Sequence, residues 1–284
     1  MRNQPKIVFT DIDGTLLDKH RGVSLATRVA VSHLSGRNIP FILISSRMPR
    51  AMTRLQVDLS ISGAPLIAYN GGLVLDGQGS VLSSQAIDLP TVSHIANSAI
   101  TLGLVTMLYH HDEWYVTERE HYALREENNT RTGATVQELA VTLTDWEERQ
   151  IGAHKVMVMG TPNGIDTLVG ELTAKYGYQL HLYRSKDDYL EIADARISKL
   201  TGVRTLIEAC YPDLSLADCV AFGDNYNDVE MLAGVGHGVA VANAREEAKA
   251  VASMLVAGNK EDGVAEGLIK IFHQRQRTSG PIPE

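Results

Sequence analysis

An apolar run near the start of the chain leads into two carboxylates that are one residue apart. The run Ile7-Val8-Phe9 precedes the string Asp11-Ile12-Asp13-Gly14-Thr15. A short, continuously apolar run is typical of a strand that is buried on both faces of a parallel sheet. Side chains at positions i and i+2 of an extended segment point the same way, so Asp11 and Asp13 can serve one site at the end of this strand. Gly14 permits the sharp turn that must follow.

A second acidic cluster follows another apolar run more than two hundred residues later. The run Cys219-Val220-Ala221-Phe222 leads directly into Gly223-Asp224-Asn225-Tyr226-Asn227-Asp228. If both runs are strands of one parallel sheet, Asp224 approaches Asp11 and Asp13 at the same edge. Three acids around one point repel one another, and a divalent cation such as Mg²⁺ removes that cost. The two clusters together therefore predict a magnesium site.

Two further positions offer donors for phosphate oxygens. Ser45 follows the apolar run Phe41-Ile42-Leu43-Ile44, and Lys199 stands at the start of a helical segment. Taken singly, Ser45 could end a strand by bonding to its own backbone, and Lys199 could be a solvated lysine. Beside the acids, their hydroxyl and ammonium groups complete a site for a phosphoryl group.

The order of the predicted elements indicates an α/β fold that is interrupted by an insert. Strands and helices alternate in residues 1–86 and again in residues 189–284, which predicts a doubly wound parallel-sheet core with helices on both faces. Residues 87–188 read instead as an inserted α+β domain. Ligands of such sheets bind at the carboxyl ends of the strands. From residue 105 to residue 192, that is in the insert and just after it, we expect strands at 105–109, 114–117, 155–159, 180–183 and 190–192, and a helix over 166–176.

Composition and charge exclude several classes of protein. The chain has 284 residues, of which 44% are hydrophobic, and this is enough for one large or two ordinary domains. The net charge of −8 argues against a nucleic-acid partner, because a polyphosphate backbone needs a broad basic face. Two cysteines, Cys210 and Cys219, form no disulfide framework, which favours a reducing compartment.

No segment indicates a membrane or a secretory route. Residues 1–6 contain no apolar signal core, and no stretch reaches the roughly 18 to 20 apolar residues that cross a bilayer. We therefore expect a cytoplasmic protein with no membrane partner, either a monomer or a small homo-oligomer. The tail from Gln274 to Glu284 is expected to be loose.

Taken together, these positions resemble the haloacid dehalogenase superfamily of phosphotransferases, and within it the Cof-type phosphatases, which carry a large C2-type cap. The resemblance covers nearly the whole chain, and the order of its motifs is more specific than any one of them. The four motifs match, in order, Asp11-Ile12-Asp13-Gly14-Thr15-Leu16, Ser45, Lys199 and Gly223-Asp224 with Asn227-Asp228. Three more strings resemble recurrent Cof-type sequences, namely Tyr69-Asn70-Gly71-Gly72, Leu190-Glu191-Ile192 and Glu261-Asp262-Gly263-Val264-Ala265.

The resemblance implies a role for each of these residues. Asp11 would attack phosphorus to form an aspartyl-phosphate, and Asp13 would protonate the leaving oxygen and then accept a proton from water. Mg²⁺ would be held by the carboxylates of Asp11 and Asp224 and the backbone carbonyl of Asp13, with Asp228 in or near its shell. The phosphoryl oxygens would contact the amide of Ile12 and the residues Ser45, Ser46, Lys199 and Asn227.

The chain departs from the family pattern at two glycines. Ser45-Ser46-Arg47 stands where the family commonly has Thr-Gly-Arg, and Lys199-Leu200 stands where it commonly has Lys-Gly. The serine hydroxyl and every charged role are retained.

The histidines and aromatic residues of the insert suggest a different kind of site. His110, His111, Trp114, Tyr115 and His121 lie close together in the sequence, but no metal-ligand spacing supports the histidines. We interpret the segment as a surface hairpin with an aromatic face. The resemblance also implies that the cap selects the leaving group, so a few of these residues would contact substrate.

These observations favour a Mg²⁺-dependent phosphatase that acts on small phosphorylated metabolites, with sugar phosphates as the favoured substrates. One alternative is a phosphomutase, which would return the phosphoryl group to its substrate. A second is a phosphate-responsive regulatory module, which needs neither the second acid at i+2 nor a large cap. The sequence does not identify the substrate, because the cap selects it and cap residues follow no general code that relates sequence to substrate.

Overall fold

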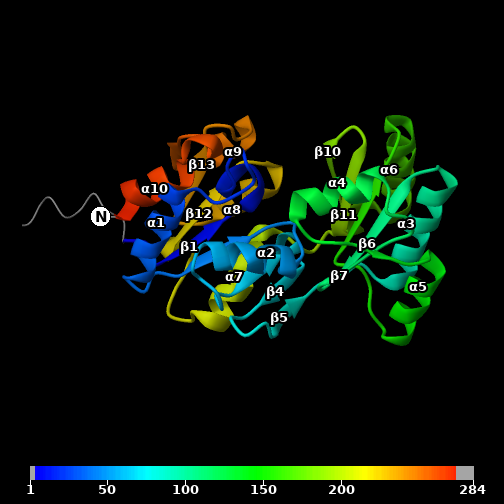
Figure 1. Ribbon diagram of the computed structural model, residues 1–284, viewed down its shortest axis with the longest axis horizontal. Coiled ribbons are helices and arrows are strands. Elements are labelled where there is room, and N and C mark those ends of the chain that lie inside the picture. Colours follow the sequence, from blue (N-terminus) through cyan, green and yellow to red (C-terminus); the bar gives the residue numbers. More distant parts are fainter. Residues whose placement is uncertain (1–3, 273–284) are drawn as a thin grey trace, which may run out of the picture.

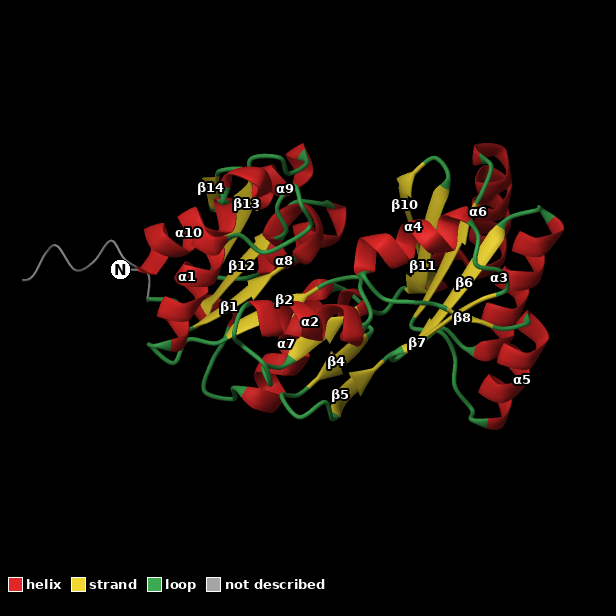
Figure 2. Cartoon of the chain, in the orientation of Figure 1, coloured by secondary structure: helices red, strands yellow, loops and turns green. Residues whose placement is uncertain are grey.

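The computed structural model describes residues 4–272, and it contains two sheets that are covered by helices (Figures 1 and 2). The first three residues and the tail from Gln274 to Glu284 lie outside the described residues. Within the described part, the larger sheet has eight strands in the order β14-β13-β12-β1-β2-β3-β4-β5. These strands are β1 (Ile7–Thr10), β2 (Phe41–Ile44), β3 (Leu66–Ala68), β4 (Leu73–Leu75), β5 (Val81–Ser84), β12 (Cys219–Gly223), β13 (His237–Val241) and β14 (Met254–Val256).

Helices cover both faces of this sheet. The connections from β1 to β2 and from β12 to β13 join parallel strands and run from the centre of the sheet in opposite directions. Right-handed crossovers therefore place α1 and α8 on opposite faces. This arrangement confirms the predicted doubly wound α/β fold class. The helices are α1 (Leu25–Ser35), α2 (Pro49–Asp58), α7 (Lys199–Cys210), α8 (Val229–Gly234), α9 (Glu246–Val251) and α10 (Gly263–Phe272).

Among the residues that the structure describes, a smaller sheet of six strands lies beside the larger one, in the order β10-β11-β9-β6-β7-β8. We call this sheet and its helices the cap, and the larger sheet and its helices the core. The strands are β6 (Val105–His110), β7 (Glu113–Val116), β8 (Thr135–Val136), β9 (Lys155–Met159), β10 (Leu180–Lys186) and β11 (Tyr189–Asp194). The helices are α3 (Leu89–Thr101), α4 (His121–Thr130), α5 (Leu139–Glu148) and α6 (Pro162–Tyr176). Helix α4 lies on the side of the cap sheet that faces the core (Figure 1).

The predicted domain boundary at residue 189 is wrong. It separates β10 from β11, but these strands pair in an antiparallel ladder from Leu180 and Asp194 to Lys186 and Tyr189. Strand β11 also pairs with β9, so it lies inside the cap sheet. A boundary between the two arms of a hairpin would break that ladder, and the chain therefore returns to the core only after Asp194.

Two local expectations also need correction. The hairpin of β6 and β7 is not a surface hairpin, because Trp114 is only 1% exposed and stacks on Tyr109 with ring centroids 5.3 Å apart. The helix expected to begin at Asp166 begins one turn earlier, at Pro162, where the Thr161 side chain accepts a hydrogen bond from the Gly164 amide. Among residues 4–272, the helices lack the combined length and apolar character that a membrane crossing requires.

Candidate functional site

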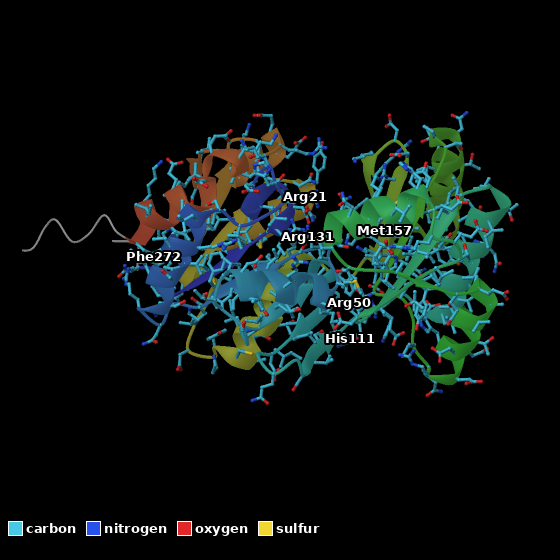
Figure 3. All side chains as sticks on the ribbon, viewed as in Figure 1. Arg21, Arg50, His111, Arg131, Met157 and Phe272 are labelled. Atoms are coloured by element: carbon cyan, nitrogen blue, oxygen red, sulfur yellow. The ribbon has the colours of Figure 1, made fainter. Side chains whose placement is uncertain are left out.

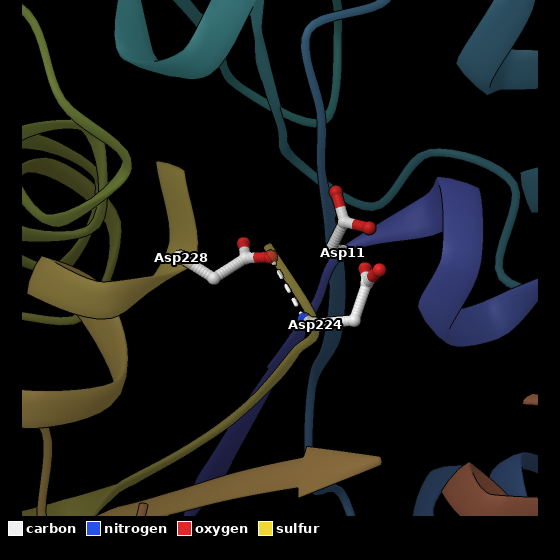
Figure 4. A group of neighbouring side chains, drawn as sticks. All are labelled: Asp11, Asp224 and Asp228. Atoms are coloured by element: carbon white, nitrogen blue, oxygen red, sulfur yellow. Dashed lines mark hydrogen bonds between the residues drawn. The ribbon is translucent and has the colours of Figure 1, made fainter. Parts of the chain in front are cut away.

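The order of the strands brings the two acidic clusters to one edge of the core sheet. Strand β1 pairs in parallel with β12, with Thr10 opposite Phe222, so the residues that follow both strands meet. Asp11 and Asp224 come directly after the last residues of these two strands, Thr10 and Gly223, and Asp228 lies one short turn further on (Figure 4). Both strands are apolar along nearly their whole length and are completely buried. The carboxylates of Asp11 and Asp224 are the first charged groups beyond the ends of these strands.

Lys199 lies between two of these carboxylates. The Ser198 side chain caps α7 by accepting a hydrogen bond from the Thr201 amide, which sets Lys199 at the first position of the helix. Its Nζ donates to Asp11 Oδ1 at 2.5 Å and to Asp228 Oδ1 at 2.6 Å, and the side chain is fully buried. Burial alone would lower the pKa of Lys199, but the two carboxylates outweigh it and raise the pKa, so the ammonium is charged.

Asp228 fixes the loop that carries Asp224. Its Oδ2 accepts hydrogen bonds from the backbone amides of Asp224, at 2.9 Å, and Asn225, at 3.0 Å. Because Lys199 occupies its other oxygen, both oxygens of Asp228 are engaged. Asp224 itself accepts a hydrogen bond from the Thr15 hydroxyl at 2.8 Å, through Oδ1 only.

The chemistry of this group fits a divalent cation. Asp11, Asp224 and Asp228 each offer a carboxylate oxygen, and these atoms lie within 4.8 Å of one another. Burial, followed by the negative charge of Asp228, raises the pKa of Asp224 to about 6. Burial also raises the pKa of Asp11 well above its usual range, and Lys199 offsets this only in part. The cluster therefore has more negative charge than its own cation balances, and a hard cation that prefers oxygen ligands would supply the remainder.

Asp13 has different neighbours. Arg47 binds its carboxylate in a bidentate pair, with Nε 2.6 Å from Oδ2 and Nη2 2.7 Å from Oδ1. Arg21, which lies on the side of the core that faces the cap, adds a third contact at 2.9 Å (Figure 3). Burial raises the pKa of Asp13, but the two guanidinium groups outweigh it and lower that pKa. Both arginines also donate to the backbone carbonyl of Asn129 in α4, so they join Asp13 to the cap.

The remaining predicted residues lie along the same edge. Ser45 is 1% exposed, and its hydroxyl accepts a hydrogen bond from the Arg47 amide. The carbonyl of Ser46 accepts a hydrogen bond from Lys155 of the cap at 3.0 Å. The side chain of Ile12 is buried, so only its backbone can contact a ligand. Asn227 donates through Nδ2 to Asn70 Oδ1 at 3.0 Å.

A cavity of about 450 Å³ lies between the core and the cap, above this edge. Burial raises the pKa of its Glu191 carboxyl, and the positive charge of Lys155 opposes this. The residues His110, His111, Trp114, Tyr115 and His121 do not belong to its lining, although we expected a few of them to contact substrate. The core contributes Asp13, Ser46, Arg47, Asn70 and Asn227, and the cap contributes Arg125, Glu126, Lys155, Tyr183, Tyr189 and Glu191, among others.

Sequence reasoning missed several residues of this cavity. Arg47 belongs to the matched string after Ser45, and this position was the available signal for it. Arg21 and Asn129 carry no such signal. Asn70 and Glu191 lie in strings that we singled out, but without a role.

Gly14 provides a test of the geometry around Asp224. Its φ is +88°, and a Cβ added there would overlap Oδ2 of Asp224. We expect Gly14→Ala to cost about 1–2 kcal/mol of stability through backbone strain, and to reduce kcat about 10²-fold because the carboxylate is displaced by an ångström or so. Chemical denaturation and steady-state kinetics measure the two effects.

Gly79→Ala is the matched control for this substitution. Gly79 has a φ of +83°, and a Cβ there would meet nothing within 4 Å. It should reproduce the strain and leave kcat unchanged. Equal kcat in the two variants would contradict the close contact between Gly14 and Asp224.

Comparison with known proteins identifies the family. The haloacid dehalogenase-like hydrolase family matches residues 8–268. A Haemophilus influenzae protein named "Putative phosphatase" is 30% identical over 264 residues, which cover 92% of this chain and 95% of the relative. A Yersinia pestis protein named HMP-PP phosphatase is 26% identical over 245 residues, which cover 86% of each chain.

The solved structures agree on the fold. A haloacid dehalogenase-like hydrolase from Bacteroides thetaiotaomicron superposes with a TM-score of 0.86 at 23% identity, over 95% of this chain and all of that chain. With its acidic edge, its buried lysine and a match from residue 8 to residue 268, this chain belongs to the haloacid dehalogenase-like hydrolases and is a phosphatase of the Cof type.

Proposed function

We propose that this protein is a Mg²⁺-dependent phosphatase that hydrolyses small phosphorylated metabolites, sugar phosphates above all, through an aspartyl-phosphate at Asp11. The observation that carries the proposal is the cluster of Asp11, Asp224 and Asp228 around Lys199. This cluster lies beside a cavity between core and cap whose lining includes Asp13 and Asn227. The family relation supports the class of reaction. The chemistry of the site supports the proposed cation and the proposed class of substrate.

The residues divide the reaction between them. Lys199 holds Oδ1 of Asp11, so Oδ2 is the oxygen that attacks phosphorus. Because Arg47 and Arg21 lower the pKa of Asp13, its carboxylate must first take up a proton when the substrate binds. As the bond to the leaving oxygen breaks, Asp13 gives that oxygen this proton, and it later removes a proton from the water that attacks the aspartyl-phosphate. Lys199 offsets the negative charge of the transferring group, with the side chains of Ser45 and Asn227 as further donors. A bound Mg²⁺ would neutralise the carboxylates and the phosphoryl oxygens.

The lining of the cavity supports a leaving group with many hydroxyl groups. The cap side combines acceptors, Glu126 and Glu191, with donors, Lys155 and Tyr189. Such pairs can exchange hydrogen bonds with several hydroxyls at once. The name HMP-PP phosphatase for one relative supports a small phosphorylated substrate.

Removal of the metal tests the proposed cofactor. We expect EDTA to stop the release of phosphate from p-nitrophenyl phosphate, and Mg²⁺ to restore it, because the three carboxylates then regain their counter-charge. Asp224→Asn should raise the Mg²⁺ concentration for half-maximal activity at least about tenfold. Asp213→Asn changes an exposed aspartate outside the site and should leave that concentration unchanged. A rate that is unaffected by chelation would contradict the metal site.

A screen of phosphorylated metabolites tests the substrate class. Sugar phosphates should give the highest kcat/KM, with one inorganic phosphate released per molecule consumed. A phosphorylated organic product without free phosphate would instead indicate a phosphomutase. A long-lived phosphoprotein without turnover would indicate a regulatory module.

A further inference from the structure

The side chain of Asn70 lies between an acid of the cap and an amide of the core. Its Nδ2 donates to Glu191 Oε1 of β11 at 3.2 Å, and its Oδ1 accepts from Asn227 Nδ2 at 3.0 Å. Asn70 is only 3% exposed, and all three residues line the cavity. A continuous chain of hydrogen bonds therefore runs from the cap sheet to the loop that follows β12.

The backbone of Asn70 is held in place by the other segments of the site. It follows β3 in a left-handed conformation with a φ of 55°, which few residue types adopt. Its amide donates to the carbonyl of Ser45 at 2.8 Å. The next residue, Gly71, has a φ of +102°, and a Cβ there would overlap the carbonyl oxygen of Ser198, just before Lys199. The Asn70 loop thus touches the segments of Ser45 and Lys199 as well as Asn227.

The carboxylate of Glu191 determines the orientation of both amides. An ionised carboxylate can only accept hydrogen bonds, so Asn70 must turn its nitrogen toward Glu191 and its oxygen toward Asn227. Asn227 must then present its own nitrogen to Asn70. Without the cap acid, the two amides could turn over together at little cost, because the hydrogen bond between them would only reverse its direction.

We propose that Asn70 is a positioning residue that couples the cap to the phosphoryl site. When the cap is docked, Glu191 orients Asn70, and Asn70 in turn orients Asn227 for the transferring phosphoryl group. The inference rests on the proposed function, in which Asn227 contacts that group. Its consequence is that Glu191 affects the chemical step for every substrate, including those whose leaving group has no hydroxyls.

A charge-swap experiment tests this coupling. Asn70→Asp keeps the size of the side chain but places two carboxylates against each other, and we expect kcat to fall about 10²-fold as Asn227 is displaced. In the double variant N70D/E191Q, the new amide can donate to the new carboxylate, which can still accept from Asn227. The double variant should therefore recover at least about tenfold of the loss. Kinetics with p-nitrophenyl phosphate and with glucose 6-phosphate should show the same recovery in kcat.

The control is a matched asparagine outside the site. Asn38 also has a left-handed backbone, with a φ of 54°, but it is exposed. Asn38→Asp should change kcat less than about twofold. A double variant N70D/E191Q that is no more active than N70D would overturn the proposal. So would an E191Q variant that is impaired with glucose 6-phosphate but normal with p-nitrophenyl phosphate, since Glu191 would then only bind hydroxyls of the leaving group.

A spectroscopic measurement keeps the test independent of turnover. In ¹⁵N-labelled protein, E191Q should shift the side-chain amide resonances of both Asn70 and Asn227, although Glu191 is hydrogen-bonded only to the first of them. A shift confined to Asn70 would show that the chain does not transmit orientation, and it would overturn the coupling. This measurement remains decisive if the wild-type protein releases no phosphate, an outcome that would refute only the proposed function.

Discussion

Asp11→Asn is expected to reduce phosphate release from p-nitrophenyl phosphate by at least about 10³-fold, as removal of a catalytic nucleophile generally does. The amide that replaces the carboxylate keeps its shape but cannot attack phosphorus. The fold should survive, because burial raises the pKa of Asp11 and a neutral group at this position avoids that cost. Lys199 retains Asp228 as a partner at 2.6 Å.

Two measurements separate the loss of the nucleophile from a general defect. Acid quenching during turnover should trap a phosphorylated wild-type protein and no phosphorylated D11N protein. Asp213→Asn, at an exposed position outside the cavity, should be phosphorylated and active like the wild type. If D11N retains activity or becomes phosphorylated, then the attacking carboxylate is not Asp11.

The parts of the site that could be predicted from the sequence are those that depend on short-range pattern. Asp11 and Asp224 each follow a continuously apolar run, and parallel strands must present the residues after such runs at one edge. The predicted neighbourhood of these acids needed only that rule. The resemblance to a known family added Ser45 and Lys199, whose residue types alone say little.

The contacts that could not be predicted join side chains across the boundary between core and cap. The carboxylate of Asp13 is held by Arg47 and Arg21, and both arginines reach the carbonyl of Asn129, more than 80 residues further along the chain than Arg47. No periodic pattern in the sequence identifies such partners, because which side chains meet depends on how the core sheet and the cap sheet are placed against each other. The contact between Asn70 and Glu191 could not be predicted for the same reason.

The misplaced boundary has a local cause. The turn between β10 and β11 contains Asp187 and Asp188, and polar residues of this kind occur equally in hairpins and in linkers between domains. The hairpin is distinguished from a linker by the antiparallel ladder between β10 and β11. Such pairing depends on both strands together, so the residues of the turn alone could not reveal it.

Lys199→Met is expected to lower the free energy of unfolding of the metal-free protein by about 3–5 kcal/mol, the usual cost of removing one partner of a buried ion pair. The substitution preserves most of the apolar volume and removes the charge. Asp11 and Asp228, 8% and 0% exposed in their side chains, would then face each other without a cation. Activity should also fall about 10²- to 10³-fold, because the donor to the transferring phosphoryl group is lost.

The loss of stability should depend on pH in a defined direction. Burial already raises the folded-state pKa of Asp224 to about 6, above its ordinary value of 3.8, and it raises the pKa of Asp11 as well. A carboxyl group whose pKa is raised by folding contributes stability below its unfolded pKa and loses it as the pH rises through the folded value. Removal of the ammonium raises these values further. The difference between wild type and K199M should therefore grow from pH 4 to pH 8, as measured by urea unfolding at each pH.

Lys6→Met separates this effect from the loss of any ion-paired lysine. Lys6 pairs with Asp218 at 3.0 Å, but its side chain is 55% exposed, so water screens the pair and its removal should change stability little at any pH. Saturating Mg²⁺ should stabilise K199M more than it stabilises K6M, because in K199M a cation among Asp11, Asp224 and Asp228 also replaces the missing ammonium, whereas K6M keeps Lys199. If Mg²⁺ stabilises both variants equally, the Lys199 ammonium and the metal do not neutralise the same group of carboxylates. The resistance of K199M to unfolding in Mg²⁺ is therefore a test of the metal site that needs no substrate.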